Sequence, residues 1–232
     1  MRTHLYKYFT ERKWAEAFLA EGSMHFSSLG YFRDYEDAQT RGDRNEGTAI
    51  LRPVGGLLVR NRTRGGNCVV SGVEFDAKAG EIFVYCASKS DNKEKRERFN
   101  AVACVEIFDA KAFCRRVQKA LPWKASFGGR PGHERLGHQV EYHKVTDDIN
   151  PRWACPDLIG ISKLDSYQWQ DEFRLLFSLT DALRFENITG RMIIGEAPRR
   201  VANPTEHNFY DLKIGGLGDI AILHKSPVSL SA

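Results

Sequence analysis

Short runs in which apolar and polar residues alternate recur along this chain, and they predict strands. In the segment 172–177, Glu172 and Arg174 alternate with large apolar side chains. A period of two places Glu172 and Arg174 on one face of the strand and the aromatic rings on the other. The same criteria predict further strands at 5–9, 24–27, 49–51, 57–60, 68–75, 82–87, 101–108, 140–145, 188–194, 209–212 and 220–224.

Helical spacing and capping residues indicate a smaller number of helices. The first is expected to begin after Thr10 and to end at Gly22, with an apolar stripe made of Trp14, Ala15, Phe18 and Leu19. A second helix is expected to begin after Asp109 and to run to Leu121, and 93–99 is a shorter candidate.

These elements predict an α+β fold with a split or sandwiched, mainly antiparallel sheet and two or three helices. Residues 76–80 are typical of a turn, which would join the strands at 68–75 and 82–87 into a hairpin. A length of 232 residues favours one domain, with surface loop insertions at about 34–48 and 122–139.

Composition narrows the class of protein. Hydrophobic residues make up 42% of the chain, which is enough for a core and excludes wholesale disorder. No apolar run approaches the roughly 18 residues of a membrane span, and the N-terminus lacks a signal-peptide pattern, so we expect a cytoplasmic protein without membrane contact. The five cysteines form no C-x-x-C pair, which fits a reducing compartment, and Cys86 and Cys104 lie in apolar runs where they favour burial.

The charge is mildly basic. The formal net charge is +4, and a basic loop occupies 60–66. Clustered arginines are compatible with contacts to nucleic-acid phosphates, RNA or DNA, although a solvated surface explains most of these charges.

Several common kinds of active site are not encoded. His133 and His138 are five residues apart, a spacing that does not place both imidazoles on one helical face, so we expect no metal. The chain has no G-x-S-x-G elbow and no phosphate-binding P-loop, and the glycines at 215–218 form a turn. A thiol nucleophile at Cys86 is disfavoured because apolar burial raises a thiol pKa.

Two candidate sites remain, each with a structural alternative. Glu172 and Arg174 could present a carboxylate in a cleft, or they could form an ion pair on a solvated sheet face. Around the first helix, Tyr6 and Phe26 could stack on a flat ring while Arg33 pairs with phosphate, or these aromatics could belong to the core.

The order of these pieces resembles the ADP-ribosyltransferase superfamily. The strand with Tyr6-Lys7-Tyr8-Phe9, the helix, the strand with Phe26-Ser27-Ser28 and the late strand with Glu172 follow that layout. More narrowly, Phe32-Arg33-Asp34, Cys86-Ala87-Ser88 and the segment 169–174 resemble the F-x-D, C-x-S and W-x-x-E-x-R motifs of an uncharacterised bacterial family found near phage-defence and abortive-infection genes. The first strand carries Lys7 between two tyrosines where the superfamily has His or Arg, and the second motif lacks a Ser-Thr-Ser.

The resemblance implies an enzyme that uses NAD as its substrate, with Glu172 as the catalytic carboxylate. It implies that NAD is bound by Tyr6, Lys7, Phe26, Ser27, Arg33, Ser88 and Arg174. A fixed carboxylate would stabilise the oxocarbenium character that builds on the ribose when the nicotinamide bond breaks.

The implied role is a bacterial toxin or phage-defence effector that modifies nucleic acid or protein and has a neutralising partner. Two alternatives stay open. Water could be the acceptor, which would make the protein an NAD glycohydrolase. Alternatively, the chain could be a non-catalytic nucleic-acid or protein binder in which Glu172 and Arg174 form a structural ion pair.

Overall fold

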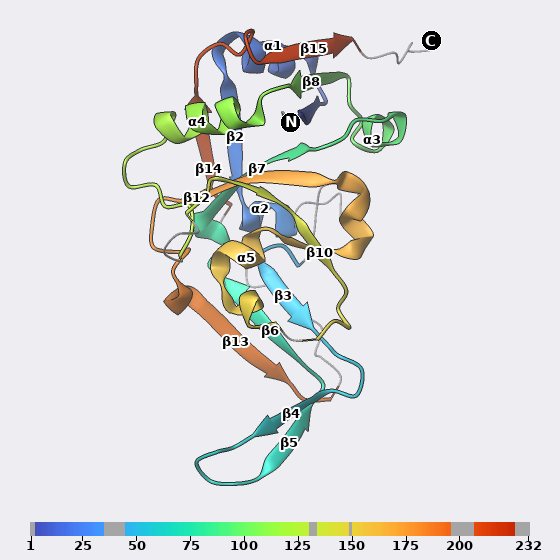
Figure 1. Ribbon diagram of the computed structural model, residues 1–232, viewed down its shortest axis with the longest axis vertical. Helices are drawn as coiled ribbons and strands as arrows, with labels where there is room; N and C mark the ends of the chain where they lie inside the picture. Colours follow the sequence, from blue (N-terminus) through green and yellow to red (C-terminus); the bar gives the residue numbers. More distant parts are fainter. Residues whose placement is uncertain (1–2, 35–44, 130–133, 149, 196–206, 226–232) are drawn as a thin grey trace.

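The computed structural model describes residues 3–34, 45–129, 134–148, 150–195 and 207–225 (Figure 1). The fold is α+β, with mostly antiparallel sheets and few helices. Five α-helices lie in the described residues, more than the two or three expected: α1 (Arg12–Glu21), α2 (Leu29–Asp34), α3 (Lys93–Arg98), α4 (Ala110–Ala120) and α5 (Pro156–Gly160). Only α1 and α4 are longer than six residues. None of these described helices is long and apolar enough to cross a membrane.

The largest sheet has eight strands and is built around β7 (Ile82–Ser88). Its main path runs β14-β2-β7-β1-β8-β15, and β12 pairs with both β7 and β9. The remaining strands of this sheet are β1 (Leu5–Phe9), β2 (Ser23–Ser28), β8 (Ala103–Ile107), β9 (Gly137–Gln139), β12 (Glu172–Ser178), β14 (Phe209–Lys213) and β15 (Ala221–Lys225).

Three small sheets complete the described part of the chain. The order of the three-stranded sheet is β13-β6-β3, β10 and β11 form a parallel pair, and β4 and β5 form a hairpin at one end of the molecule (Figure 1). Their strands are β3 (Thr48–Leu51), β4 (Leu57–Arg60), β5 (Asn67–Val70), β6 (Gly72–Ala77), β10 (Glu141–His143), β11 (Ser162–Leu164) and β13 (Ile188–Ile193). Four 3-10 helices connect elements within the described residues: η1 (Ala79–Glu81), η2 (Pro151–Ala154), η3 (Asp165–Gln170) and η4 (Phe185–Asn187).

The hairpin predicted between 68–75 and 82–87 is wrong. The first segment divides into β5 and β6, which belong to different sheets, and β6 pairs with β3 and β13 and not with β7. The turn is a real one, η1, but it carries the chain from the three-stranded sheet to the large one. A turn signal fixes a local change of direction, whereas strand partners are chosen by the packing of remote segments.

The first helix differs from the prediction at its start. Its N-cap is Glu11, not Thr10, and Trp14 from the predicted apolar stripe is 53% exposed. The predicted end is confirmed, because Gly22 caps the helix with a φ of 62°, where a Cβ atom would lie 2.4 Å from the carbonyl oxygen of Gly215. Asp109 caps α4 as predicted, since its carboxylate accepts from the backbone N–H of Ala112 at 2.8 Å.

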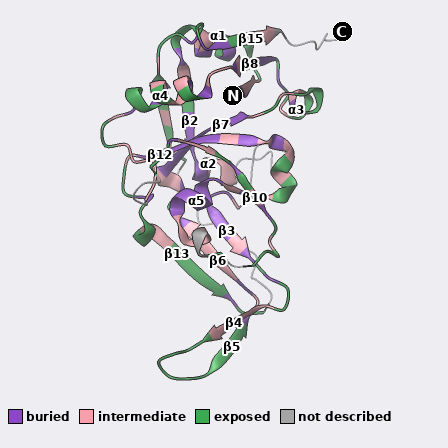
Figure 2. Cartoon of the chain, viewed as in Figure 1, coloured by how far each residue is buried: buried purple, intermediate pink, exposed green. Residues whose placement is uncertain are grey.

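Strands β7 and β12 are covered on both faces, which places them at the centre of the molecule (Figure 2). On one face, Phe18 of α1 and Phe113 of α4 belong to the same apolar cluster as Leu175 and Phe177. On the other face, Leu176 and Val84 pack against α5 and α2 in a second apolar cluster. Glu172 and Arg174 share the face of Leu176 because strand side chains alternate, so they point into the protein interior.

Candidate functional site

Four charged side chains meet in the interior beside β12. Glu46 precedes β3, Lys163 lies in β11, and Glu172 and Arg174 lie in β12. Their exposed fractions are 2%, 5%, 5% and 1%. Two carboxylates and two cations therefore form a closed group without net charge, which we call the buried charge network. Buried charges persist only when they are paired in this way.

Arg174 is the centre of the network. Its guanidinium donates to both carboxylate oxygens of Glu46, at 2.5 Å and 2.9 Å, in the two-pronged geometry that arginine favours. It also donates to Glu172, at 3.2 Å and 3.4 Å, and to the carbonyl oxygen of Gly160 at 2.7 Å. All three guanidinium nitrogens thus have acceptors.

Lys163 closes the other side of the network. Its Nζ lies 3.0 Å from Glu172 Oε2 and donates to Gln170 Oε1 at 2.8 Å, with Glu46 Oε2 at 3.9 Å. Lys163 reaches Glu172 because η3 reverses the chain between β11 and β12 and ends at Asp171, whose φ of 44° is left-handed. Glu172 is therefore held between a lysine from the preceding strand and an arginine from its own strand.

The backbone around Glu172 is fixed by two further hydrogen bonds. The N–H of Glu172 donates to the hydroxyl of Tyr142 at 2.9 Å, and Ser88 Oγ donates to the carbonyl of Gln170 at 2.8 Å. Both bonds join β12 or its approach to neighbouring strands, so they set the direction of the carboxylate.

The electrostatics of the network keep Glu172 ionised. Burial by itself would raise the pKa of Glu172, but the charges of Arg174 and Lys163 outweigh it and lower the pKa to about 2. The pKa of Lys163 is raised, since the attraction of Glu172 and Glu46 exceeds the opposing effect of burial. The Cys86 thiol lies beside these groups, and burial followed by the charge of Glu172 raises its pKa to about 12, the direction expected for a thiol in apolar surroundings.

Because Glu172 is ionised, the free energy of unfolding depends on pH in the acid range. The pKa of Glu172 lies below its ordinary 4.5, so its stabilising effect is complete above pH 4.5 and is lost as the pH falls from 4.5 towards 2. We expect this group alone to remove about 3 kcal/mol of unfolding free energy across that interval. Urea unfolding of the wild type and Glu172→Gln at a series of pH values measures it, because the stability difference between them should narrow in acid. A difference that stays constant down to about pH 3 would contradict the assignment.

The structure brings three of the predicted site residues into one row. Tyr6 of β1 lies opposite Ser88 of β7, and Ser88 lies opposite Glu172 of β12. Residues directly opposite in antiparallel strands project on the same face. The Tyr6 hydroxyl turns towards β8, where it donates to Glu106 at 3.3 Å.

Lys7 fills a gap in the large sheet. β12 occupies one edge of β7 throughout, and the other edge is shared by β2, at Val84 and Phe83, and by β1, at Ser88. Between these contacts, Lys7 Nζ donates to the carbonyl of Cys86 at 2.8 Å and lies 4.0 Å from the centre of the Tyr85 ring. Lys7 thereby stabilises the split in the sheet.

Three other predicted site residues do not join this row, and the ring-stacking role expected for Phe26 does not fit its position in the core. The Phe26 ring is 0% exposed and packs at 5.1 Å and 78° against Phe177, which leaves no free face for a ligand. Ser27 is buried in β2. Arg33 donates to the carbonyl of Glu46 at 2.9 Å and to Thr48 Oγ1 at 3.3 Å, so it braces the segment that delivers Glu46.

Sequence reasoning missed Glu46, Lys163 and Gln170. Glu46 lies near the end of the predicted surface loop at about 34–48, of which 35–44 lie outside the described residues, yet Glu46, Gly47 and Thr48 are buried. The sequence gives only a weak indication that Lys163 is buried, because this lysine lies in a largely apolar stretch that begins at Leu158. Glu172 and Arg174 do form an ion pair, but the expectation that this pair lies on a solvated sheet face is wrong, because both side chains are buried.

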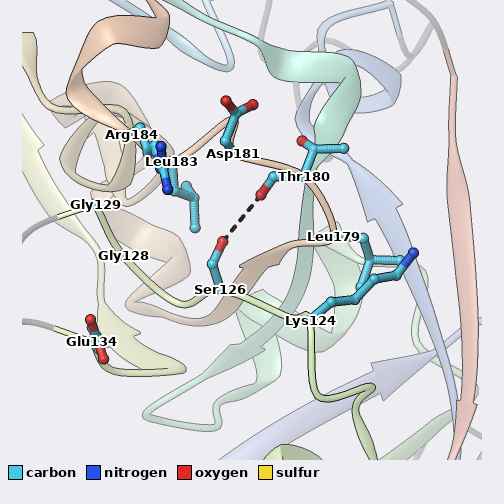
Figure 3. A pocket seen from close by; sticks show the side chains of 10 residues that line it. All are labelled: Lys124, Ser126, Gly128, Gly129, Glu134, Leu179, Thr180, Asp181, Leu183 and Arg184. Atoms are coloured by element: carbon cyan, nitrogen blue, oxygen red, sulfur yellow. Dashed lines mark hydrogen bonds between the residues drawn. The ribbon is translucent and has the colours of Figure 1, made fainter.

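A separate hollow of about 440 Å³ lies beside the 122–129 loop (Figure 3). In it, Ser126 Oγ donates to the carbonyl of Thr180 at 3.4 Å, the contact marked in Figure 3. None of the predicted site residues contributes to its lining, which is formed by Lys124, Ser126, Gly128, Gly129, Glu134, Leu179, Thr180, Asp181, Leu183 and Arg184.

Within the described ranges, no three His, Cys, Asp or Glu side chains are grouped to hold a metal ion, and His133 lies outside those ranges. No protein-family model matches the sequence, and no curated protein or solved structure matches the chain significantly.

Proposed function

We propose that this protein is an NAD-dependent ADP-ribosyltransferase with an ADP-ribosyltransferase-like fold, and that Glu172 is its catalytic carboxylate. The observation that carries the proposal is the row of Tyr6, Ser88 and Glu172 across β1, β7 and β12. The three motifs of the superfamily are expected on three strands in this chain order, and here those strands are neighbours.

The electrostatics of Glu172 suit this chemistry. Breaking the nicotinamide–ribose bond of NAD develops positive charge on the ribose, and an ionised, fixed carboxylate stabilises it. Lys163 and Arg174 keep the pKa of Glu172 at about 2 against the effect of burial, so the carboxylate is charged at neutral pH. Its position is fixed by the same two partners.

The reaction also requires access to the carboxylate. Both oxygens of Glu172 face cations, and the side chain is 5% exposed. The proposal therefore includes an opening step in which η3, which carries Gln170 over the site, moves away and a ribose hydroxyl replaces Lys163 at Oε2. Lids that open and close over reacting groups are common in enzymes.

The acceptor is proposed to be a nucleic acid or a protein, with the chain acting as a toxin or phage-defence effector that a partner neutralises. Hydrolysis of NAD uses the same residues with water as the acceptor. The second candidate is a non-catalytic nucleic-acid or protein binder, and the closed, neutral state of the buried charge network favours it. In that case Glu172 and Arg174 are structural.

Incubation with NAD labelled in its ADP-ribose part tests the proposal. We expect release of nicotinamide, measured by chromatography, and transfer of the label to DNA, RNA or lysate protein when each is added separately. Label that appears only as free ADP-ribose assigns the protein as a hydrolase. An absence of nicotinamide release under every condition would favour the non-catalytic binder.

A further inference from the structure

The β4–β5 hairpin stands apart from the body of the molecule. It forms a sheet of its own, paired from Leu57 with Val70 to Arg60 with Asn67. In Figure 1 it extends beyond β6 and β13 at one end of the long axis, and Figure 2 shows it largely exposed. A two-stranded hairpin alone is marginally stable, so this projecting one would gain stability from contact with a partner.

The segment 47–73, which contains the hairpin, carries the whole net charge of the chain. Residues 47–73 contain the arginines 52, 60, 62 and 64 and no Asp or Glu, whereas the rest of the sequence balances 30 basic against 30 acidic side chains. Arg60, Arg62 and Arg64 are exposed, and no carboxylate among the described residues pairs with them. Some other surface cations of this protein do have such partners, for example Arg12 with Glu16 at 2.8 Å.

The tip of the hairpin is shaped to present these arginines. The Asn61 side chain accepts from the backbone N–H groups of Thr63 and Arg64, both at 3.0 Å, and the Asn61 N–H donates to the Gly66 carbonyl at 3.0 Å. Gly65 and Gly66 close the turn with φ values of 71° and 92°. The loop is thus organised by its backbone, which leaves the guanidinium groups directed to solvent.

We propose that the β4–β5 hairpin is an arm that binds duplex DNA. Arg60, Arg62 and Arg64 would contact phosphates, and the exposed apolar pair of Leu58 and Val69, 55% and 63% exposed, would face the groove. A two-stranded ribbon fits the major groove of B-form DNA, and thymine methyl groups accept apolar contacts there. The inference does not depend on Glu172.

The composition of the arm favours duplex DNA over single-stranded nucleic acids and duplex RNA. Residues 57–70 contain no Phe, Tyr or Trp, so the arm lacks the stacking platforms that single-stranded nucleic acids use. Duplex RNA is disfavoured because its major groove is deep and narrow.

Fluorescence anisotropy with a labelled random DNA duplex of about two helical turns tests the proposal. We expect salt-dependent binding, and we expect the triple variant Arg60→Gln, Arg62→Gln, Arg64→Gln to bind about 10²-fold more weakly at about 0.1 M salt. The slope of log affinity against log salt should become shallower by about 3, since each phosphate contact contributes about 0.9. The Lys substitutions at the same three positions should retain most of the affinity.

The matched control removes three exposed charges on α4, through Lys111→Gln, Arg115→Gln and Lys119→Gln. It should leave the affinity within about threefold of wild type, because surface charges that make no phosphate contact leave the salt slope unchanged. Both triple variants should unfold at the wild-type temperature. Equal losses in the two variants, no binding by wild type at low salt, or tighter binding of single-stranded DNA or of duplex RNA would each overturn the proposal.

Discussion

Replacing Arg174 with methionine should lower the free energy of unfolding by about 3–5 kcal/mol, the largest effect of any single substitution proposed for this protein. Methionine fills much of the space of arginine but donates no hydrogen bond. Glu46 and Glu172, 2% and 5% exposed, would then share Lys163 alone, and the carbonyl of Gly160 would lose its donor. An uncompensated buried charge is costly because no water can replace the lost partner. Urea unfolding followed by circular dichroism measures the change.

The control for this substitution is Arg12→Met on α1. Arg12 pairs with Glu16 in an exposed i,i+4 bridge at 2.8 Å, with side chains 63% and 57% exposed. Removal of an exposed pair should cost less than about 1 kcal/mol, because water solvates both groups. If Arg174→Met and Arg12→Met destabilised the protein equally, the buried charge network would not be a major source of stability.

Glu172→Gln should reduce NAD turnover by about 10²–10³-fold, the loss typical when one group that stabilises transition-state charge is removed. Glutamine keeps the shape of the side chain and abolishes its charge. The same substitution also disturbs the network, so a loss of activity by itself would not separate catalysis from folding.

Glu46→Gln supplies the comparison. It removes one negative charge from the same network by the same isosteric change, and Arg174 loses its two-pronged partner. We expect both variants to be destabilised, but only Glu172→Gln to lose turnover when nicotinamide release is measured at a temperature where both are folded. Parallel losses of turnover in the two variants would instead assign Glu172 a purely structural role.

Much of the candidate site could be predicted from local pattern. The alternation in β12 correctly placed Glu172 and Arg174 on one face, and Phe173, Leu175 and Phe177 on the other. Ser88 was expected at the end of an apolar strand and lies there, opposite Glu172. The pairing of Arg174 with Glu46 could not be predicted, because 128 residues separate them and no local pattern links them.

The sequence determined most of the strands and helix ends, since these follow from the spacing of apolar residues and from caps such as Gly22 and Asp109. Tertiary structure decided which strands pair, and so which charges meet. It separated β6 from β7, placed β1 and β2 on one edge of β7, and buried an acid–arginine pair that resembled a surface feature. The physical reason is that alternation specifies two faces of a strand, whereas burial depends on what packs against each face.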